Sequence, residues 1–313
     1  MIKNDQDLHR TQRIALIGEA MVELSDVDFA RSSAKVGCAG DTLNTAVYLA
    51  RALAGGAWSS DYMTVLGEDP LSAEIARFIA AEGIGTNAIG RTTDRGPAVY
   101  AIHVDEFGER TFTYWRAHSA ARLLFQTDRP TLDDLAAYRI IYLSGITLAI
   151  LPRNVRLALI ETCKSLKSQG HMIVFDSNYR PTLWPSEDEA RRDIAKMWEA
   201  TTVALPSHDD EALLYPDETP ESALSRISAH GVVEIALKRG PRGPLLWIDG
   251  NVIDGDYAPA ERVIDTTAAG DSFNATYLAA RLKGIDPPDA ALAGHRFAMR
   301  VIGSKGAILP KTP

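Results

Sequence analysis

Short apolar runs alternate with segments of helical periodicity along most of this chain. The runs that predict buried strands are 13–19, 62–66, 140–145, 172–176 and 203–205. Continuous apolar runs are typical of parallel strands that are covered on both faces. From about residue 131 onward, strands and helices alternate with short links. This alternation predicts an α/β fold with a parallel sheet.

Amphipathic helices are predicted between the strands. One begins near Asp41, a plausible N-cap, and has apolar residues at helical spacing. These residues are Leu43, Ala46, Val47, Ala50 and Leu53. Further helices are expected over 71–81, after Pro152, and over 187–201 and 289–304. Two short runs, 245–248 and 252–254, predict a hairpin.

The pattern changes to strict alternation in a second group of segments. Residues 99–104 and 110–116 alternate apolar and polar positions and are rich in aromatic residues, and 105–109 is a predicted turn between them. Residues 21–36 alternate more weakly and carry charges. Because alternation leaves one face of a strand in water, we expect about 21–36 and 92–117 to form a small β-lid outside the main sheet. The same face could pair with another subunit.

The bulk composition limits the possible partners. The 313-residue chain is 46% hydrophobic, and with neither repeats nor a linker we expect one domain, 1–313, with the lid. Its net charge of −8 argues against nucleic acid as a partner. Two distant cysteines, Cys38 and Cys163, are typical of a reducing cytoplasm. No apolar run is long enough for a membrane span, and the polar residues 1–12 lack a secretory signal.

The stretch 265–271 has the strongest chemical signal. It lies between the apolar pair 263–264 and a helical run, 273–280. A strand end, a small-residue turn and a helix start predict an anion-binding site, because free N–H groups and the helix dipole favour negative charge there. Small residues at 268–270 would let a phosphate approach the backbone. The chain contains no Gly-Lys-Ser/Thr of a Walker A loop.

Asp271 lies at the phosphate-binding end of this stretch. A carboxylate beside an anion is unfavourable for binding alone, but it is suited to removing a proton from a hydroxyl that attacks phosphorus. The alternative is that Asp271 only caps the helix.

At this point the chain resembles the ribokinase-like (PfkB) carbohydrate kinases. Residues 265–271 are similar to the C-terminal signature of the family, with Ala268 where the family has Gly. Residues 37–44 resemble its N-terminal Gly-Gly signature, with Ala39 in place of the first Gly and Asn44 at the matching Asn. The resemblance implies a three-layer sandwich whose mostly parallel central sheet is flanked by helices, with a small β-sheet lid. It also implies that Asp271 is the catalytic base.

Further runs resemble the subgroup of this family that phosphorylates 2-keto-3-deoxygluconate. They are 17–24, 40–45, 108–116, 142–146 and 178–184, and the similarity extends from about 13 to 310. By resemblance, the residues at the sugar acid are Gly40, Asp41, Asn44, Tyr100, Tyr114, Arg116 and Arg180. Those near ATP are Asn178, Ser207, Lys238, Gly240, Gly243 and Gly270. Ala268, Ala269 and Gly270 would hold the transferred phosphoryl group through their N–H groups.

Three of these assignments leave alternatives open. Residues 238–243 form a basic, Gly-containing turn that lies along the nucleotide in the family, but the turn is also compatible with a surface loop, and Lys238 could simply pair with an acid. Ser207 and Asp210 replace the Asn and Glu of the family's Asn-x-x-Glu, so Asp210 would act on Mg²⁺ through water. Arg116 and Arg180 could offer a guanidinium to a carboxylate, or lie at the lid surface and at phosphate.

The expected activity is ATP-dependent phosphorylation of the primary hydroxyl of 2-keto-3-deoxygluconate, with Mg²⁺ on the nucleotide. The alternatives are a fructokinase-like enzyme for a neutral sugar and a non-catalytic sugar-acid sensor. A Rossmann oxidoreductase is disfavoured because no Gly-x-Gly-x-x-Gly follows the first strand.

Overall fold

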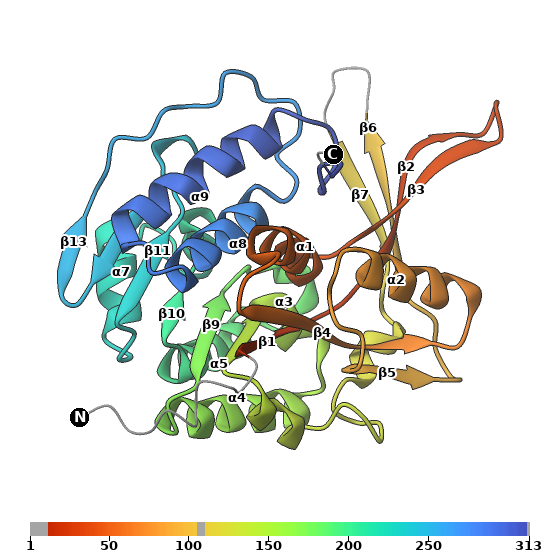
Figure 1. Cartoon of the computed structure of the whole chain (residues 1–313), viewed down its shortest axis with the longest axis horizontal. Helices are drawn as coiled ribbons and strands as arrows, with labels where there is room; N and C mark the ends of the chain where they lie inside the picture. Colours follow the sequence, from red (N-terminus) through yellow and green to blue (C-terminus); the bar gives the residue numbers. More distant parts are fainter. Residues whose placement is uncertain (1–11, 105–109, 312–313) are drawn as a thin grey trace.

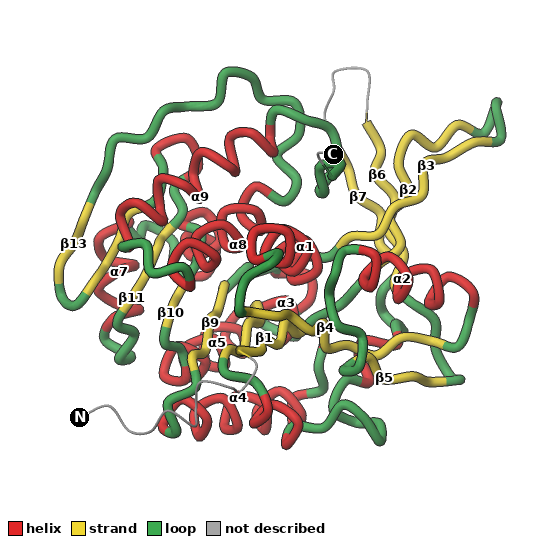
Figure 2. Tube along the Cα trace, viewed as in Figure 1, coloured by secondary structure: helices red, strands yellow, loops and turns green. Residues whose placement is uncertain are grey.

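The computed structural model describes residues 12–104 and 110–311, and its larger sheet has nine strands (Figures 1 and 2). Their order is β13-β12-β11-β10-β9-β8-β1-β4-β5. The strands are β1 (Gln12–Ile17), β4 (Trp58–Gly67), β5 (Ile89–Thr92), β8 (Ile140–Ser144), β9 (Met172–Asp176), β10 (Val203–Ala204), β11 (Glu234–Leu237), β12 (Leu245–Ile248) and β13 (Asn251–Ile253). From β11 to β5 neighbouring strands are parallel, whereas β12 and β13 form the predicted antiparallel hairpin.

Helices cover both faces of this sheet. On one face lie α1 (Asp41–Leu53), α2 (Pro70–Ala81), α8 (Ala269–Leu282) and α9 (Pro287–Ile302). On the other lie α3 (Gly145–Ile150), α4 (Arg153–Ser168), α5 (Glu187–Ala200), α6 (His208–Leu214) and α7 (Pro220–Ser228). In β1, Ile14 and Leu16 pack into the first layer, and Ala15 and Ile17 into the second. Because successive side chains point to opposite faces, this explains why the strand is apolar throughout. The predicted three-layer α/β fold is confirmed.

A separate four-stranded sheet forms the lid. Its order is β3 (Ser33–Ala39), β2 (Met21–Asp28), β6 (Ala98–Val104) and β7 (Arg110–Trp115). Figure 1 shows it beside the main body, with β2 continuing from β1 and β3 leading into α1. Its buried face packs Met21, Tyr100 and Ile102 against Ala307 of the C-terminal segment. The smaller sheet is therefore confirmed, while the turn predicted over 105–109 lies outside the described residues.

Two local predictions are wrong. Val263 and Ile264 do not form a strand; they are exposed, and the backbone there is held by hydrogen bonds from the N–H groups of Ile264 and Asp265 to the carbonyl of Ile302 (2.7 and 3.1 Å). Asp41 does not cap α1, because Gly40 occupies the N-cap position and Asp41 is the first helical residue. In the described part of the chain, no helix is both long and apolar enough to cross a membrane.

Candidate active site

A cavity of about 980 Å³ lies between the lid and the carboxyl ends of the central strands. Most of the residues that the sequence nominated line it: Gly40, Asp41, Asn44, Tyr100, Tyr114, Arg116, Asn178, Arg180, Ser207, Asp210, Lys238, Ala268, Ala269, Gly270 and Asp271. Gly240 and Gly243 line a second cavity, of about 160 Å³, which shares Lys238, Ala269 and Gly270 with the first. The nominated residues thus come together from segments more than 200 residues apart, such as Asn44 and Asp271 (separation 227).

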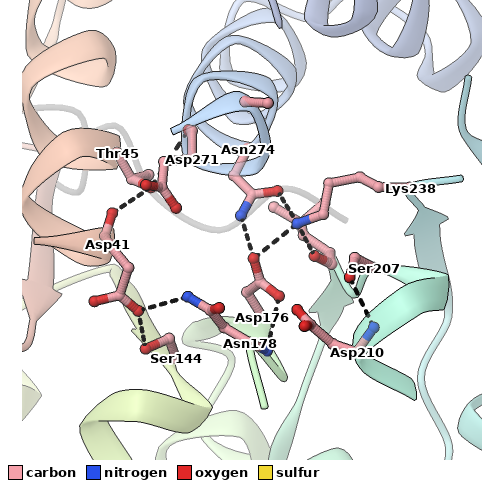
Figure 3. Close-up of polar contacts among 12 residues, drawn as sticks. Asp41, Thr45, Ser144, Asp176, Asn178, Ser207, Asp210, Lys238, Asp271 and Asn274 are labelled. Atoms are coloured by element: carbon pink, nitrogen blue, oxygen red, sulfur yellow. Dashed lines mark hydrogen bonds and ion pairs between the residues drawn. The ribbon is translucent and has the colours of Figure 1, made fainter. Parts of the chain in front are cut away.

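Asp271 lies in the first turn of α8 and faces the larger cavity (Figure 3). It is not the helix cap, because Ala268 is the N-cap residue and no side chain caps this helix. Its carboxylate accepts a hydrogen bond from Asn44 Nδ2 at 2.9 Å. Burial, and then the negative charges of Asp41 and Asp176, raise the pKa of Asp271 to about 8, although the Asn44 hydrogen bond and Lys238 oppose the shift. Such a pKa is suited to a general base near neutral pH.

Ala268 adopts the left-handed conformation, with φ of 60°. This geometry explains why the similar signature normally has Gly here, since a Cβ costs energy in that region. The methyl group of Ala268 contributes to packing, because Ala268 contacts the lid cluster of Met21, Tyr100 and Ile102. Gly270, by contrast, has no left-handed φ, and a Cβ there would meet only Lys238, at an ordinary contact distance of 3.6 Å.

The backbone around Ala268 offers fewer donors than the sequence implied. The N–H of Ala269 already donates to the carbonyl of Thr266 (3.2 Å). Within the described chain, the N–H groups of Ala268 and Gly270 have no such acceptor. The donors for an anion at this helix start are therefore those two groups rather than all three.

Asp41 lies opposite Asp271, and two neighbouring side chains donate hydrogen bonds to its carboxylate. Its Oδ2 accepts hydrogen bonds from Ser144 Oγ and from Asn178 Nδ2 (2.9 Å), as Figure 3 shows. Asn178 has a left-handed φ of 31°, and its N–H donates to Asp176 Oδ1. Asn178 therefore lies beside Asp41, the residue that the resemblance placed at the sugar.

Packing within the protein requires a residue without a Cβ at Gly40. A Cβ at this position would lie 2.2 Å from the carbonyl oxygen of Glu19. The glycine thus allows the start of α1 to approach the end of β1, which brings Asp41 to the cavity.

Lys238 belongs to a buried polar network below the cavity. Its ammonium donates to Asp176 Oδ2 (2.7 Å), to Asn274 Oδ1 (2.9 Å) and to the carbonyl of Leu205 (2.6 Å). Asn274 Nδ2 donates in turn to Asp176 Oδ2 and to the Tyr142 hydroxyl. Three bonds use the three donors of a lysine. The alternative that Lys238 pairs with an acid is therefore what the structure shows, although the side chain still borders both cavities (Figure 3).

Arg180 and Asp210 form an ion pair at the cavity wall. Arg180 Nη1 lies 2.7 Å from Asp210 Oδ1 and also donates to the carbonyl of Tyr179. Burial raises the pKa of Asp210, although Arg180 opposes this shift. Ser207 caps α6 by accepting from the Asp210 N–H (3.1 Å). No group of three or more acidic, His or Cys side chains that could hold a metal occurs in the described residues.

Gly240 and Gly243 both have left-handed φ, of 56° and 72°. A Cβ on Gly243 would overlap the ring of Tyr257 at 2.2 Å, so packing alone requires glycine there. Gly240 has open space around its Cα. The small cavity beside this turn is closed by Phe273, Ala298 and Met299.

Arg116 is already paired. Its Nη2 lies 2.6 Å from Glu19 Oε2; Glu19 is buried and Arg116 is half-buried. Glu19 also accepts a hydrogen bond from Ser119 Oγ. Beside them Tyr100 stacks on Tyr114, with ring centroids 5.6 Å apart, and the Tyr100 hydroxyl donates to Glu23. The guanidinium lines the cavity; Glu19 lies against its charge, but its buried Nε has no hydrogen-bond partner among the described residues.

The structure gives roles to four residues of the site to which the sequence assigned none. Asp176 and Asn274 anchor the buried network, Ser144 holds Asp41, and Glu19 holds Arg116. Asp176 and Glu19 are polar residues at the ends of predicted strands, where ligands bind in open parallel sheets, so the sequence does indicate them as part of the site but gives them no role. Asn274 is a polar residue inside an apolar helical run, which is a weaker signal.

Comparison with known proteins agrees with this geometry. The profile of the pfkB family carbohydrate kinases matches residues 11–313. The chain is 41% identical over 307 residues to the 2-dehydro-3-deoxygluconokinase of Dickeya dadantii (strain 3937), which covers 96% of this chain and 97% of that protein. It is 40% identical over 306 residues to the Escherichia coli (strain K12) protein of the same name, with 96% and 98% covered.

The solved structure of 2-dehydro-3-deoxygluconokinase from Thermotoga maritima has a TM-score of 0.83 at 20% identity and covers 96% of this chain and 95% of that one. This likeness shows the fold. The profile match and the relatives near 40% identity show the family: this chain is a member of the pfkB family of carbohydrate kinases.

Proposed function

We propose that this protein is an ATP-dependent kinase that phosphorylates the primary hydroxyl of 2-keto-3-deoxygluconate, also called 2-dehydro-3-deoxygluconate. The observation that carries the proposal is Asp271 at the start of α8, facing a cavity whose lid side presents arginines. The names of the bacterial relatives near 40% identity support the choice of acceptor. The chain would act as one domain with its β-lid.

The proposed chemistry follows from the residues at the cavity. Asp271 removes the proton of the attacking hydroxyl, and Asn44 holds the carboxylate by its 2.9 Å hydrogen bond. Asp41 accepts hydrogen bonds from the sugar's other hydroxyls, because Ser144 and Asn178 fix only one of its oxygens. The N–H groups of Ala268 and Gly270 stabilise the charge on the transferred phosphoryl group. Closure of the lid would exclude water and limit hydrolysis of ATP.

The nucleotide is placed at the small cavity. Gly240 has room beside its Cα, and Phe273, Ala298 and Met299 offer an apolar surface to a base. This cavity adjoins the larger one at Gly270, so a nucleotide that lies there directs its phosphates to Asp271.

Mg²⁺ would balance charge on the ATP oxygens. The carboxylate at the cavity wall that fits it is Asp210, which has one oxygen on Arg180 and a second that no described residue bonds. A single carboxylate together with water and phosphates is a usual environment for Mg²⁺. The rest of its coordination would come from ATP and solvent.

The lid also supports a proposal of self-association. Val36 and Trp115 are exposed large apolar residues on the two edge strands of this sheet, on the face opposite to Phe112 and Tyr114, which line the larger cavity. Exposed apolar side chains on a sheet are a feature of interfaces when they gather against a partner. We propose a homo-oligomer that forms through the lid; sedimentation of wild type and of Trp115→Lys tests it, and a monomer at all concentrations would refute it.

A coupled assay with a panel of acceptors tests the activity. The expected result is a kcat/KM for 2-keto-3-deoxygluconate on the order of tenfold or more above that for fructose, because a charge-assisted hydrogen bond is worth ~1.5–3 kcal/mol. A preference for fructose would make the protein a neutral-sugar kinase. Binding of the sugar acid without any phosphoryl transfer would make it a sensor.

A further inference from the structure

A third cavity lies at the end of α1 that points away from the active site. Its volume is about 800 Å³, which is within the range of small-molecule sites. The end of α1, the start of β4, α9 and the last described residues form its walls, and we call it the α1–α9 cavity. Among the described residues, none that lines this cavity also lines either of the other two. The side chains on which the argument below depends are Tyr48, Arg51, Trp58, Glu82, Phe297 and Arg300.

Positive charge predominates around the α1–α9 cavity. Arg51 and Lys311 both pair with Glu82, with nitrogen–oxygen distances of 2.8 and 3.4 Å. Arg300, in the last turn of α9, has neither an ion pair nor a side-chain hydrogen bond within residues 12–104 and 110–311. Three cations therefore surround one carboxylate, and the guanidinium of Arg300 is available to an added anionic group.

Aromatic rings form much of the remaining wall. Phe297 packs edge-on against Tyr48, with ring centroids 5.2 Å apart, and Trp58 is half-buried. The Tyr48 hydroxyl already donates to the carbonyl of Ala307 (2.8 Å) and accepts from the N–H of Leu309 (3.0 Å), so Tyr48 contributes only its ring to the wall. A sugar, with its many hydroxyl groups, fits such a wall poorly, whereas an anion with a flat apolar body matches both the rings and the charge.

One face of α1 connects this cavity to the active site. Asn44, Tyr48 and Arg51 follow one another at helical spacing and so lie on the same face of the helix. Asn44 donates to Asp271, and Arg51 Nη1 donates to the carbonyl of Leu309 (2.6 Å). Because seven helical residues span about 10 Å, the two sites are held by the same rigid element at a short distance.

The last described residues form a second connection, between the α1–α9 cavity and the lid. Ala307 packs against the buried face of the lid, and Leu309, Pro310 and Lys311 line the cavity. Figure 1 shows the end of the chain beside the lid strands. A ligand in contact with Leu309 therefore adds contacts to the segment that supports the lid, and the lid covers the acceptor.

We propose that the α1–α9 cavity is a second ligand site, that it binds a small aromatic anion, and that its occupancy strengthens binding of the acceptor. Arg300 pairs with the anionic group, and the rings of Phe297 and Trp58 contact the apolar body. The site goes beyond the proposed activity, because this ligand takes no part in phosphoryl transfer.

Titration calorimetry with 8-anilinonaphthalene-1-sulfonate tests the site, in the presence of saturating ATP so that the nucleotide cavity is filled. We expect one equivalent to bind to wild type. Arg300→Glu should weaken this binding at least tenfold, as for a lost charge-assisted hydrogen bond. Arg296→Glu is the matched control, because Arg296 is also exposed on α9 but does not line the cavity in the described chain, and it should change binding less than about threefold. Ala54→Trp adds bulk at the cavity wall without changing charge and should also weaken binding.

The coupling is tested with whichever acceptor the panel of acceptors selects, so it does not depend on the identity of that acceptor. Saturating probe should lower the KM for the acceptor at least about threefold in wild type and in Arg296→Glu, but not in Arg300→Glu. Since coupling between two sites is reciprocal, the acceptor should tighten binding of the probe by a similar factor in calorimetry.

Three results would overturn the site: no binding to wild type, binding that ATP abolishes, or equal losses in Arg300→Glu and Arg296→Glu. Binding that leaves the KM for the acceptor unchanged, or raises it, would overturn the coupling.

Discussion

Asn44 of α1 and Asp271 of α8 are joined by a 2.9 Å hydrogen bond from the Asn44 amide to the Asp271 carboxylate. The bond fixes the carboxylate at the point where the helix start offers the N–H groups of Ala268 and Gly270. It also stabilises the charged form of Asp271 against the burial and the acidic neighbours that raise its pKa. The position and the basicity of Asp271, the proposed base, therefore depend on a contact between the two segments that carry the family signatures, 37–44 and 265–271.

The first prediction concerns pH. Because the pKa of Asp271 is raised to about 8 in the free protein, its carboxyl is mostly protonated at pH 6 and mostly ionised at pH 9. The base form therefore increases with pH, and kcat/KM, which reports the free enzyme, should rise about tenfold per pH unit below that pKa and level off above it. A pH–rate profile with 2-keto-3-deoxygluconate measures this. A profile that is flat from pH 6 to 9 would contradict the assigned pKa.

Asn44→Ala should move the same profile. Loss of the donor disfavours the carboxylate, so the pKa of Asp271 rises and the acid limb shifts to higher pH, by roughly half a unit to one unit. At pH 7 the variant should be slower, and at high pH it should recover much of the difference. Thr276→Ala is the control. Thr276 lies later in the same helix, α8, and its substitution should leave the acid limb of the pH profile in place. A lower plateau with an unshifted limb would show that Asn44 acts only on binding.

Arg116→Ala is expected to damage the fold rather than selectivity. Removing Arg116 leaves the buried Glu19 without its ion-pair partner, and breaking a buried pair costs about 3–5 kcal/mol. Denaturant unfolding should show this loss. The value of kcat/KM should fall by a similar factor for 2-keto-3-deoxygluconate and for 3-deoxyfructose, its analogue with a hydroxymethyl group in place of the carboxylate. The double variant Glu19→Gln with Arg116→Ala should regain stability. If Arg116→Ala were stable and selectively poor with the acid, Arg116 would be the carboxylate partner.

Ala268 tests the geometry of the anion site. Ala268→Gly relieves the left-handed Cβ, worth ~1–2 kcal/mol, but loses a methyl contact with the lid, worth about 0.8 kcal/mol. We expect stability within about 1 kcal/mol of wild type and kcat within threefold. Ala268→Val adds a β-branched side chain at φ of 60° and should lose stability and most turnover. Thermal unfolding and steady-state rates of the two variants measure both effects. An Ala268→Val variant with the stability and the turnover of wild type would contradict this prediction.

Much of the fold could be predicted because local pattern and tertiary environment agree. The continuous apolar run of β1 reflects burial on both faces. The alternation in β6 and β7 does not correspond to one dry and one wet face, because Tyr100, Ala101 and Ile102 are buried in succession while Phe112, Tyr114 and Trp115 are all exposed. The apolar pair Val263 and Ile264 does not form the predicted strand, because two apolar residues make a strand only beside another strand to which their backbone can hydrogen-bond. Their backbone instead bonds the end of α9.

The site was predictable in its members but not in its pairings. The signature residues do meet at one cavity, yet the partners of Arg116, Lys238 and Asp210 lie 97, 62 and 30 positions away in the chain, at places set by the sheet order. No spacing rule reveals that Glu19 is the ion-pair partner of Arg116. Such balances depend on which strand ends are neighbours.

The central claim is that Asp271 is the base of a sugar-acid kinase, and the most direct measurement is the turnover of Asp271→Asn. With 2-keto-3-deoxygluconate and ATP both saturating, the variant should form product at a rate ~10²–10⁴-fold below wild type, since that is the usual contribution of a positioned base. Calorimetry should show sugar-acid binding kept within a few-fold, because Asn preserves the shape of the side chain. A variant that turns over within a few-fold of wild type would contradict the account.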